Sequence, residues 1–165
     1  MVILPSMVEY SNEAIKVSIS APSGWTIETS EENQFRLFGP LESGFEEYFD
    51  EYRCTMSYIL GEPEDSTQLN WFETLVRDSQ QEIAEEYNAY ELIRESHHEI
   101  FGRPAYLHYF EWTEENLNLR LSQLQSLIQA NDLSFYLINA AALKPLDEKY
   151  MPIFTAILNS TKILP

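Results

Sequence analysis

The feature that most constrains the fold is a series of extended segments joined by short polar turns in the second half of the chain. Residues 90–101 and 104–112 predict a hairpin that turns at Gly102-Arg103. Pro104 is tolerated there because it opens its strand. Strands that follow one another through tight turns indicate an antiparallel meander, so a sheet must organise this part of the molecule.

A second hairpin is predicted next along the chain. Residues 117–129 and 133–142 are both extended in character, and Asn131-Asp132 between them tolerates the positive φ of a turn. Within the first of these segments every second residue is apolar up to Leu121, but the next apolar residue is Leu124, which would lie on the opposite face of a regular strand. We therefore expect a β-bulge near Ser122-Gln123.

Four shorter segments before the meander also predict strands, and two segments predict helices. Asp65 and Gln68 resemble a capping box, and apolar residues recur at helical spacing after them, which predicts a long amphipathic helix at about 66–87. Apolar spacing from Leu146 to Leu158 predicts a C-terminal helix, which either is kinked by Pro152 or starts at that residue. The four strands are predicted at 15–21, 25–28, 35–38 and 54–60.

This order of elements predicts an α+β fold, in which a mostly antiparallel, twisted sheet is packed by the long helix and the C-terminal helix. The 165 residues fit a single domain, 1–165. No apolar run is long enough for a transmembrane helix, and the first residues lack the pattern of a signal peptide. Cys54 is the lone cysteine, which agrees with a reducing compartment. We therefore expect a cytoplasmic protein without membrane insertion.

The net charge of −17 is concentrated in the first part of the chain, where residues 1–102 carry 5 Lys/Arg against 21 Asp/Glu. This field repels phosphate backbones and anionic membrane surfaces, which excludes nucleic acid as an expected partner. The acidic excess either provides solubility alone or forms a docking surface for a basic protein partner.

Several short motifs resemble those of the PsbP-like superfamily, which includes PsbP, a Ran-binding nuclear import factor, DcrB and LpqN. The resemblance covers about residues 15–164. Its motifs are Ala21-Pro22-Ser23-Gly24-Trp25, Phe38-Gly39-Pro40, Gly102-Arg103-Pro104-Ala105 with Trp112, Tyr150-Met151-Pro152-Ile153-Phe154 and Ser160-Thr161-Lys162.

The motif Gly102-Arg103-Pro104-Ala105, together with Trp112 at the end of the following strand, is most similar to the DcrB-like branch, which in turn is similar to the Eag chaperones that shield apolar segments of effectors. The resemblance implies a PsbP-like fold and a protein-binding or chaperone-like module that is not an enzyme. It implies no functional residue, because the matching positions are turn residues and core aromatics.

One segment has the pattern of a docking element. Its aromatic residues fall at helical spacing on one face, and its acidic residues occupy the other face. The alternative is a connecting turn whose aromatics cover the sheet edge. The residues concerned are Phe45, Tyr48, Phe49 and Tyr52 with Glu46, Glu47, Asp50 and Glu51.

A second hypothesis concerns the first hairpin of the meander. A turn at Gly102-Arg103 would place His97 opposite His108, and a slip of one residue would pair His98 instead. Two facing imidazoles could share a zinc ion. This leaves a small-ligand or metal-binding protein as the alternative function.

Known catalytic patterns are missing from the sequence. The serines lack a Gly-x-Ser-x-Gly turn, and the glycines form no dinucleotide or phosphate loop, so no cofactor is implied. Cys54 lies in an alternating strand, where cysteine is usually a small buried hydrophobe. The leading hypothesis is a non-enzymatic module that binds a protein partner which is basic or presents an apolar segment; a homodimer is also compatible with exposed sheet edges.

Overall fold

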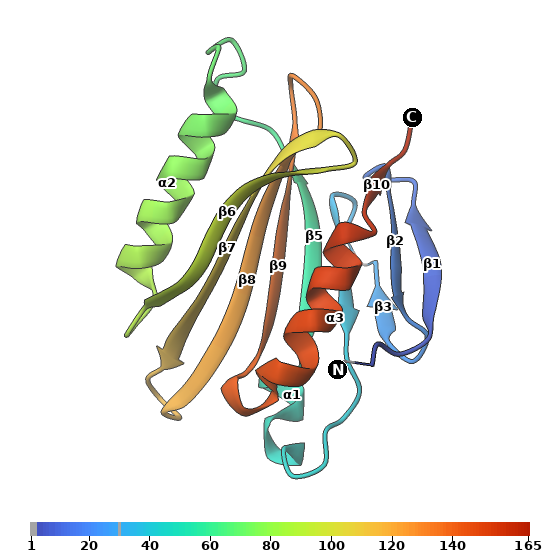
Figure 1. Ribbon diagram of the computed structural model, residues 1–165, viewed down its shortest axis with the longest axis vertical. Coiled ribbons are helices and arrows are strands. Elements are labelled where there is room, and N and C mark those ends of the chain that lie inside the picture. The colour runs from blue at the N-terminus through green and yellow to red at the C-terminus, as the bar shows by residue number, and fades with distance from the viewer. Residues whose placement is uncertain (1–2, 30) are drawn as a thin grey trace.

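The structure is a computed structural model that describes residues 3–29 and 31–165, and it has the predicted α+β fold (Figure 1). None of the helices in this part of the chain is long and apolar enough to cross a membrane. The helices are η1 (Glu46–Tyr48), α1 (Phe49–Tyr52), α2 (Trp71–Glu86), η2 (Lys144–Leu146) and α3 (Asp147–Asn159). The strands are β1 (Met7–Asn12), β2 (Val17–Pro22), β3 (Thr26–Glu28), β4 (Gln34–Phe38), β5 (Thr55–Gly61), β6 (Glu91–Ile100), β7 (Arg103–Glu114), β8 (Leu119–Gln129), β9 (Phe135–Leu143) and β10 (Lys162–Ile163).

The strands form two sheets. The larger sheet has seven antiparallel strands in the order β3-β4-β5-β9-β8-β7-β6, and the smaller has the order β1-β2-β10. In the smaller sheet β2 was predicted, at 15–21, whereas β1 was not, because it lies in a segment without clear alternation. This sheet joins the two ends of the chain, since Lys162 pairs with Ser18.

The main core lies between the large sheet, α3 and the small sheet. Ile153, Phe154 and Ile157 of α3 are buried there against residues of β2, β5, β8 and β9. Figure 1 shows α3 running between the strands of the large sheet and those of the small one. The opposite face of the large sheet is packed by α2, where Trp71 and Phe72 form a second cluster with Tyr106 and Leu127.

Because both faces of β8 are packed, the predicted bulge near Ser122-Gln123 was wrong. The registers of β8 with β7 and with β9 are continuous through these residues. Leu121 faces the α2 side and Leu124 the α3 side, and both are buried. The change of apolar phase therefore marks burial on both faces of β8. A register shift does occur in the neighbouring pairing of β6 with β7, between Leu92 and Arg94.

The long helix begins later than the capping-box pattern predicts. Asp65 accepts hydrogen bonds from the backbone N–H and the hydroxyl of Thr67, at 3.0 and 2.5 Å, so it forms a turn before the helix. The helix starts at Trp71, and Leu69 in the preceding turn is 96% exposed. Pro152 lies inside α3, which starts at Asp147.

Candidate functional site

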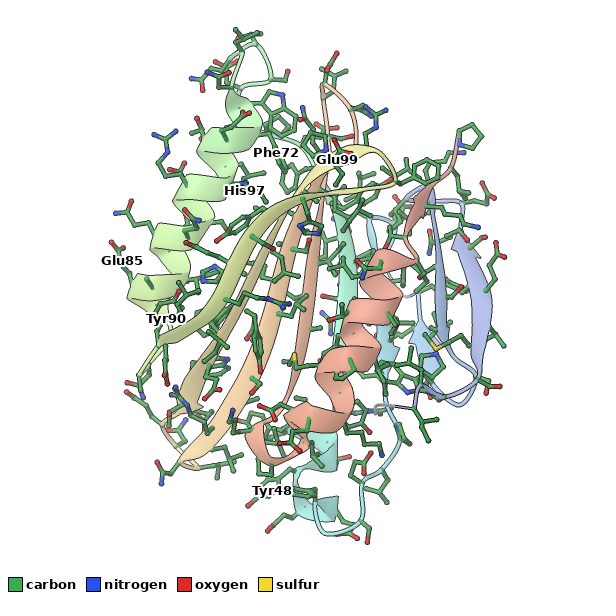
Figure 2. The ribbon with its side chains drawn as sticks, viewed as in Figure 1. Tyr48, Phe72, Glu85, Tyr90, His97 and Glu99 are labelled. Atoms are coloured by element: carbon green, nitrogen blue, oxygen red, sulfur yellow. The ribbon has the colours of Figure 1, made fainter. Side chains whose placement is uncertain are left out.

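The aromatic–acidic segment, residues 45–52, lies at one end of the molecule, below the start of α3 (Figure 2). It forms η1 followed directly by α1. Phe45, Tyr48 and Tyr52 are half-buried, and the side chain of Phe49 lies outside the described residues. The four acidic side chains, Glu46, Glu47, Asp50 and Glu51, are exposed.

Glu42 fixes the start of this loop to α3. Its carboxylate accepts hydrogen bonds from Lys149 Nζ, at 2.6 Å, and from the Tyr150 hydroxyl. Burial acts to raise the pKa of Glu42, but these two bonds outweigh it and lower the pKa below its ordinary value. The aromatic–acidic segment is therefore tied to the first turn of α3.

The predicted register of the histidine hairpin was wrong. The turn consists of Phe101 and Gly102, whose φ values are +52° and +72°, and not of Gly102 and Arg103. Two consecutive positive φ values fit the type I′ turn that matches the twist of a two-residue hairpin. As a result His97 lies opposite Tyr106, and His108 lies opposite Glu95. The facing pair of imidazoles on which the metal hypothesis depended is not formed.

His108 instead belongs to a packed group of side chains on the α2 side of the sheet. It is 2% exposed, its Nε2 lies 2.6 Å from the Tyr90 hydroxyl, and its buried Nδ1 has no hydrogen-bond partner. Desolvation lowers the pKa of the His108 imidazole. Nearby, the Tyr106 hydroxyl donates to Glu95 at 2.9 Å and accepts from Gln80 of α2 at 2.7 Å. No sequence pattern predicted this group, because its members come from α2, β6, β7 and the residue before β6.

Two other kinds of reactive site, a metal centre and a nucleophilic thiol, lack the side-chain arrangement that they require. In the part of the chain that the structure describes, no group of three or more His, Cys, Asp or Glu side chains is placed to hold a metal ion. Cys54 is 4% exposed, and desolvation raises the pKa of its thiol well above the ordinary value. A thiol in this state is a poor nucleophile.

A groove of about 760 Å³ lies between α3 and the strands β6, β7 and β8, and we call it the α3 groove. Ile93 on β6 is 42% exposed at its rim, and Leu4 is 44% exposed beside it. The lining is mostly apolar: Leu4, Ile93, Arg94, Tyr109, Leu124, Met151, Pro152, Thr155, Ala156 and Asn159.

The α3 groove exists because the two sides of α3 carry different side chains. Ile153, Phe154 and Ile157 point into the core, while Thr155 and Ala156, on the adjoining side of the helix, face the strands. These two small side chains do not fill the space below the β6–β7 hairpin. Placing the groove requires knowing which helix packs on which strand, so the sequence could not predict it.

Charged side chains near the lower end of the sheet neutralise one another. Lys144 Nζ lies 2.6 Å from Glu111 and 2.9 Å from Asp147, and Arg120 lies 3.4 Å from Glu111 and 3.3 Å from Glu91. These pairs join β6, β7, β8 and the start of α3. They are structural ion pairs, and none of the three carboxylates is left unpaired to act as a general base.

A second, smaller groove of about 400 Å³, which we call the α2 groove, lies between α2 and the strands β8 and β9. Its floor is apolar and its rim is acidic. The floor includes Trp71, Leu75, Leu127, Phe135 and Leu137, and the rim includes Glu62, Glu64, Asp65, Asp78 and Glu82.

Comparison with solved structures identifies the fold. LpqN of Mycobacterium tuberculosis, which is involved in cell envelope biogenesis, superposes with a TM-score of 0.69 at 14% identity, over 97% of this chain and 91% of that one. The cyanobacterial PsbP of Synechocystis gives 0.62 at 15% identity, over 98% and 94%. The Ran-binding protein Mog1p of Saccharomyces cerevisiae gives 0.63 at 11% identity, over 98% and 97%.

The chain has the PsbP-like fold. No protein-family model matches the sequence, and no curated protein matches it either. At these identities the likeness assigns the PsbP-like fold and no function, because one fold can carry many kinds of site. A structure from Pseudomonas aeruginosa that has the same fold, at 15% identity and a TM-score of 0.61, is itself of unknown function.

Proposed function

We propose that the protein is a non-enzymatic, cytoplasmic module that binds a protein partner, and that the α3 groove holds a segment of this partner. The observation that carries the proposal is the apolar, open character of the groove, which has about 760 Å³ of space and exposed Leu4 and Ile93 at its rim. Exposed apolar surface of this kind is typical of interaction sites. Ran-binding Mog1p has the same fold, so a PsbP-like domain can carry a protein-binding surface.

The charges around the groove support binding over catalysis. Glu111 of β7 and Asp147, the first residue of α3, are buried acids and are paired with Lys144. An active site needs ionisable groups that converge on a substrate. Most of the side chains that line the groove are apolar, and of the lining residues Arg94 is the one that carries a charge.

The test fills the groove and leaves a matched surface unchanged. A photoreactive side chain at position 155 is used in the native host to crosslink and identify the partner, and the purified partner is then titrated against two variants. Ala156→Trp places a large ring in the groove, and Ala84→Trp places the same ring on the exposed side of α2. We expect about a tenfold loss of affinity for Ala156→Trp and little change for Ala84→Trp. Equal affinities for the two variants would refute the proposal.

We also propose that the aromatic–acidic segment contributes to this docking, because its acids are exposed and its described aromatics are half-buried. Tyr48→Ala should weaken binding of the same partner about tenfold, as expected for an aromatic anchor. Leu41→Ala is the control, since Leu41 is 54% exposed just before the segment. If the two variants bind equally well, the segment is a connecting turn.

The alternative function, a metal or small-ligand site at His97 and His108, has lost its main support. The register separates the two residues, and His108 Nε2 is already bonded to Tyr90.

A further inference from the structure

In the part of the chain that the structure describes, no strand pairs with the outer edge of β6. β6 is the last strand of the large sheet and pairs with β7 on one side only. Most of its ten residues are exposed, including Glu95, His97 and Glu99. An open edge of this length presents a row of peptide groups to which another extended chain can bind.

The hairpin geometry shows which peptide groups face outward. Pairs in an antiparallel ladder alternate between hydrogen-bonded and non-hydrogen-bonded, and the pair that flanks a two-residue turn is hydrogen-bonded. Ile100 and Arg103 are that pair. The N–H and C=O groups of Glu95, His97 and Glu99 therefore point away from β7. The register shift between Leu92 and Arg94 limits the regular edge to residues 94–100.

The side chains along this edge differ between the two faces of the sheet. Glu95 and Glu99 lie on the α2 side, and Glu95 is held in place by the Tyr106 hydroxyl at 2.9 Å and by Gln80 at 3.2 Å. On the other side Arg94 lines the apolar α3 groove. A strand added to this edge would place every second side chain next to the carboxylates and the others over the mouth of the groove.

We propose that the edge of β6 binds an extended segment of the protein partner by strand addition, and that this segment alternates basic with apolar residues. The inference rests on the proposed function and names the class of its ligand. Charge complementarity selects the occupant: basic side chains meet Glu95 and Glu99 in a chain whose net charge is −17. A second copy of the chain would bring a further −17 to the same edge, so it is the disfavoured occupant.

The probe is a labelled, end-capped heptapeptide with the sequence Lys-Val-Lys-Val-Lys-Val-Lys, and binding is measured by fluorescence anisotropy. His97→Pro removes one outward N–H without breaking a bond to β7, because proline is tolerated at an edge in this position. His97→Ala is the matched control, since it removes the same imidazole and keeps the N–H. We expect His97→Pro to bind the peptide about tenfold more weakly than His97→Ala, because proline removes one hydrogen bond to the added strand and weakens the adjacent ones. Melting curves of the two variants confirm that both are folded.

The charge requirement is tested separately. Glu99→Lys should weaken peptide binding about tenfold, whereas Glu85→Lys makes the same change of charge on α2 and should have little effect. Figure 2 shows Glu99 on β6 and Glu85 on α2, well apart from each other. A peptide of the same composition with its four lysines in one block should bind more weakly than the alternating peptide.

The outcomes separate this inference from the proposed function. Suppose that Ala156→Trp no longer binds the partner, while His97→Pro binds both the partner and the peptide as tightly as His97→Ala does. The groove then binds the partner without strand addition, and the inference is wrong. No binding of the alternating peptide, or a dimer in sedimentation that His97→Pro dissociates, also overturns it.

Discussion

The Tyr90 hydroxyl lies 2.6 Å from Nε2 of His108, at the bottom of the layer between α2 and the sheet. His108 is 2% exposed, and its other ring nitrogen is buried without a partner. A proton on this ring would place an incompletely paired charge among the rings of Tyr90, Tyr106 and Phe110. The folded protein therefore favours neutral His108.

The stability of the protein should decrease in mildly acidic solution because of this residue. Desolvation lowers the pKa of His108 in the folded state, so below pH 6.5 the unfolded chain binds a proton that the folded chain resists. The free energy of unfolding then falls by at most about 1.4 kcal/mol per pH unit from this group. Urea denaturation of the wild type and of His108→Phe between pH 7.5 and 5 measures the difference. Parallel pH profiles for the two proteins would show that His108 does not titrate in this way.

The hairpin turn should become more stable when its first residue is changed. Phe101 has a φ of +52° and is 57% exposed. A left-handed conformation costs a bulky residue about 1 kcal/mol, and asparagine tolerates it. Phe101→Asn should therefore raise the free energy of unfolding by about 1 kcal/mol. Leu133→Asn, at a residue that is 64% exposed in another turn, is the control and should give no such gain.

Removing one buried hydroxyl should weaken the attachment of the small sheet. The Tyr136 hydroxyl donates to the carbonyl oxygen of Ile15 at 2.6 Å, and both residues are buried. Tyr136→Phe leaves this carbonyl without its donor, which should cost about 1–2 kcal/mol in chemical denaturation. Tyr52→Phe, at a half-buried position of the aromatic–acidic segment, should change stability by less than about 0.5 kcal/mol. Equal stabilities of the two variants would contradict the prediction.

Lys144 should contribute to stability mainly through the two carboxylates that it pairs. Glu111 and Asp147 are 7% and 9% exposed, so Lys144→Met leaves them without this cation. The Lys144 side chain is itself 44% exposed, which limits the expected cost to about 1–2 kcal/mol at pH 7. Lys162→Met, at an exposed residue of β10, is the control.

The effect of Lys144→Met should depend on pH. Burial acts to raise the pKa of Asp147, but the bonds from Lys144 and Ser122 outweigh it and lower the pKa below 3.8. The stability that this pairing provides is present above pH 3.8 and is lost as the pH falls through the lowered value. The wild type and the variant should therefore converge in stability below about pH 3.8, and a difference that stays constant down to pH 3 would contradict this origin.

The fold was predictable from the sequence where one local signal decided the structure. The meander from residue 90 onward, the long helix and the C-terminal helix follow from apolar periodicity and turn residues. The predicted bulge and the predicted start of the long helix were wrong, because tertiary contacts and a local turn determine the structure at those places. Leu121 and Leu124 are buried on opposite faces of β8, so their spacing imitates a bulge, and Asp65 makes a turn of its own before the helix.

The site was less predictable than the fold. The register of the β6–β7 hairpin depends on which two residues adopt positive φ, and Phe101 is an unusual choice for one of them. The α3 groove depends on Ile93 and Thr155 coming together from distant parts of the chain. The aromatic–acidic segment, in contrast, was visible as a pattern, and its role as a docking element stays a prediction.

The pairing of β10 with β2 has a consequence for the way the protein is made. Lys162 lies beside Ser18, and the N–H of Leu164 donates to the carbonyl of Lys16 at 2.8 Å. During synthesis on the ribosome, the first strands emerge long before their last partner is translated. The β1–β2 hairpin therefore lacks this neighbouring strand during synthesis, and the small sheet is completed only after residues 162–164 have left the exit tunnel.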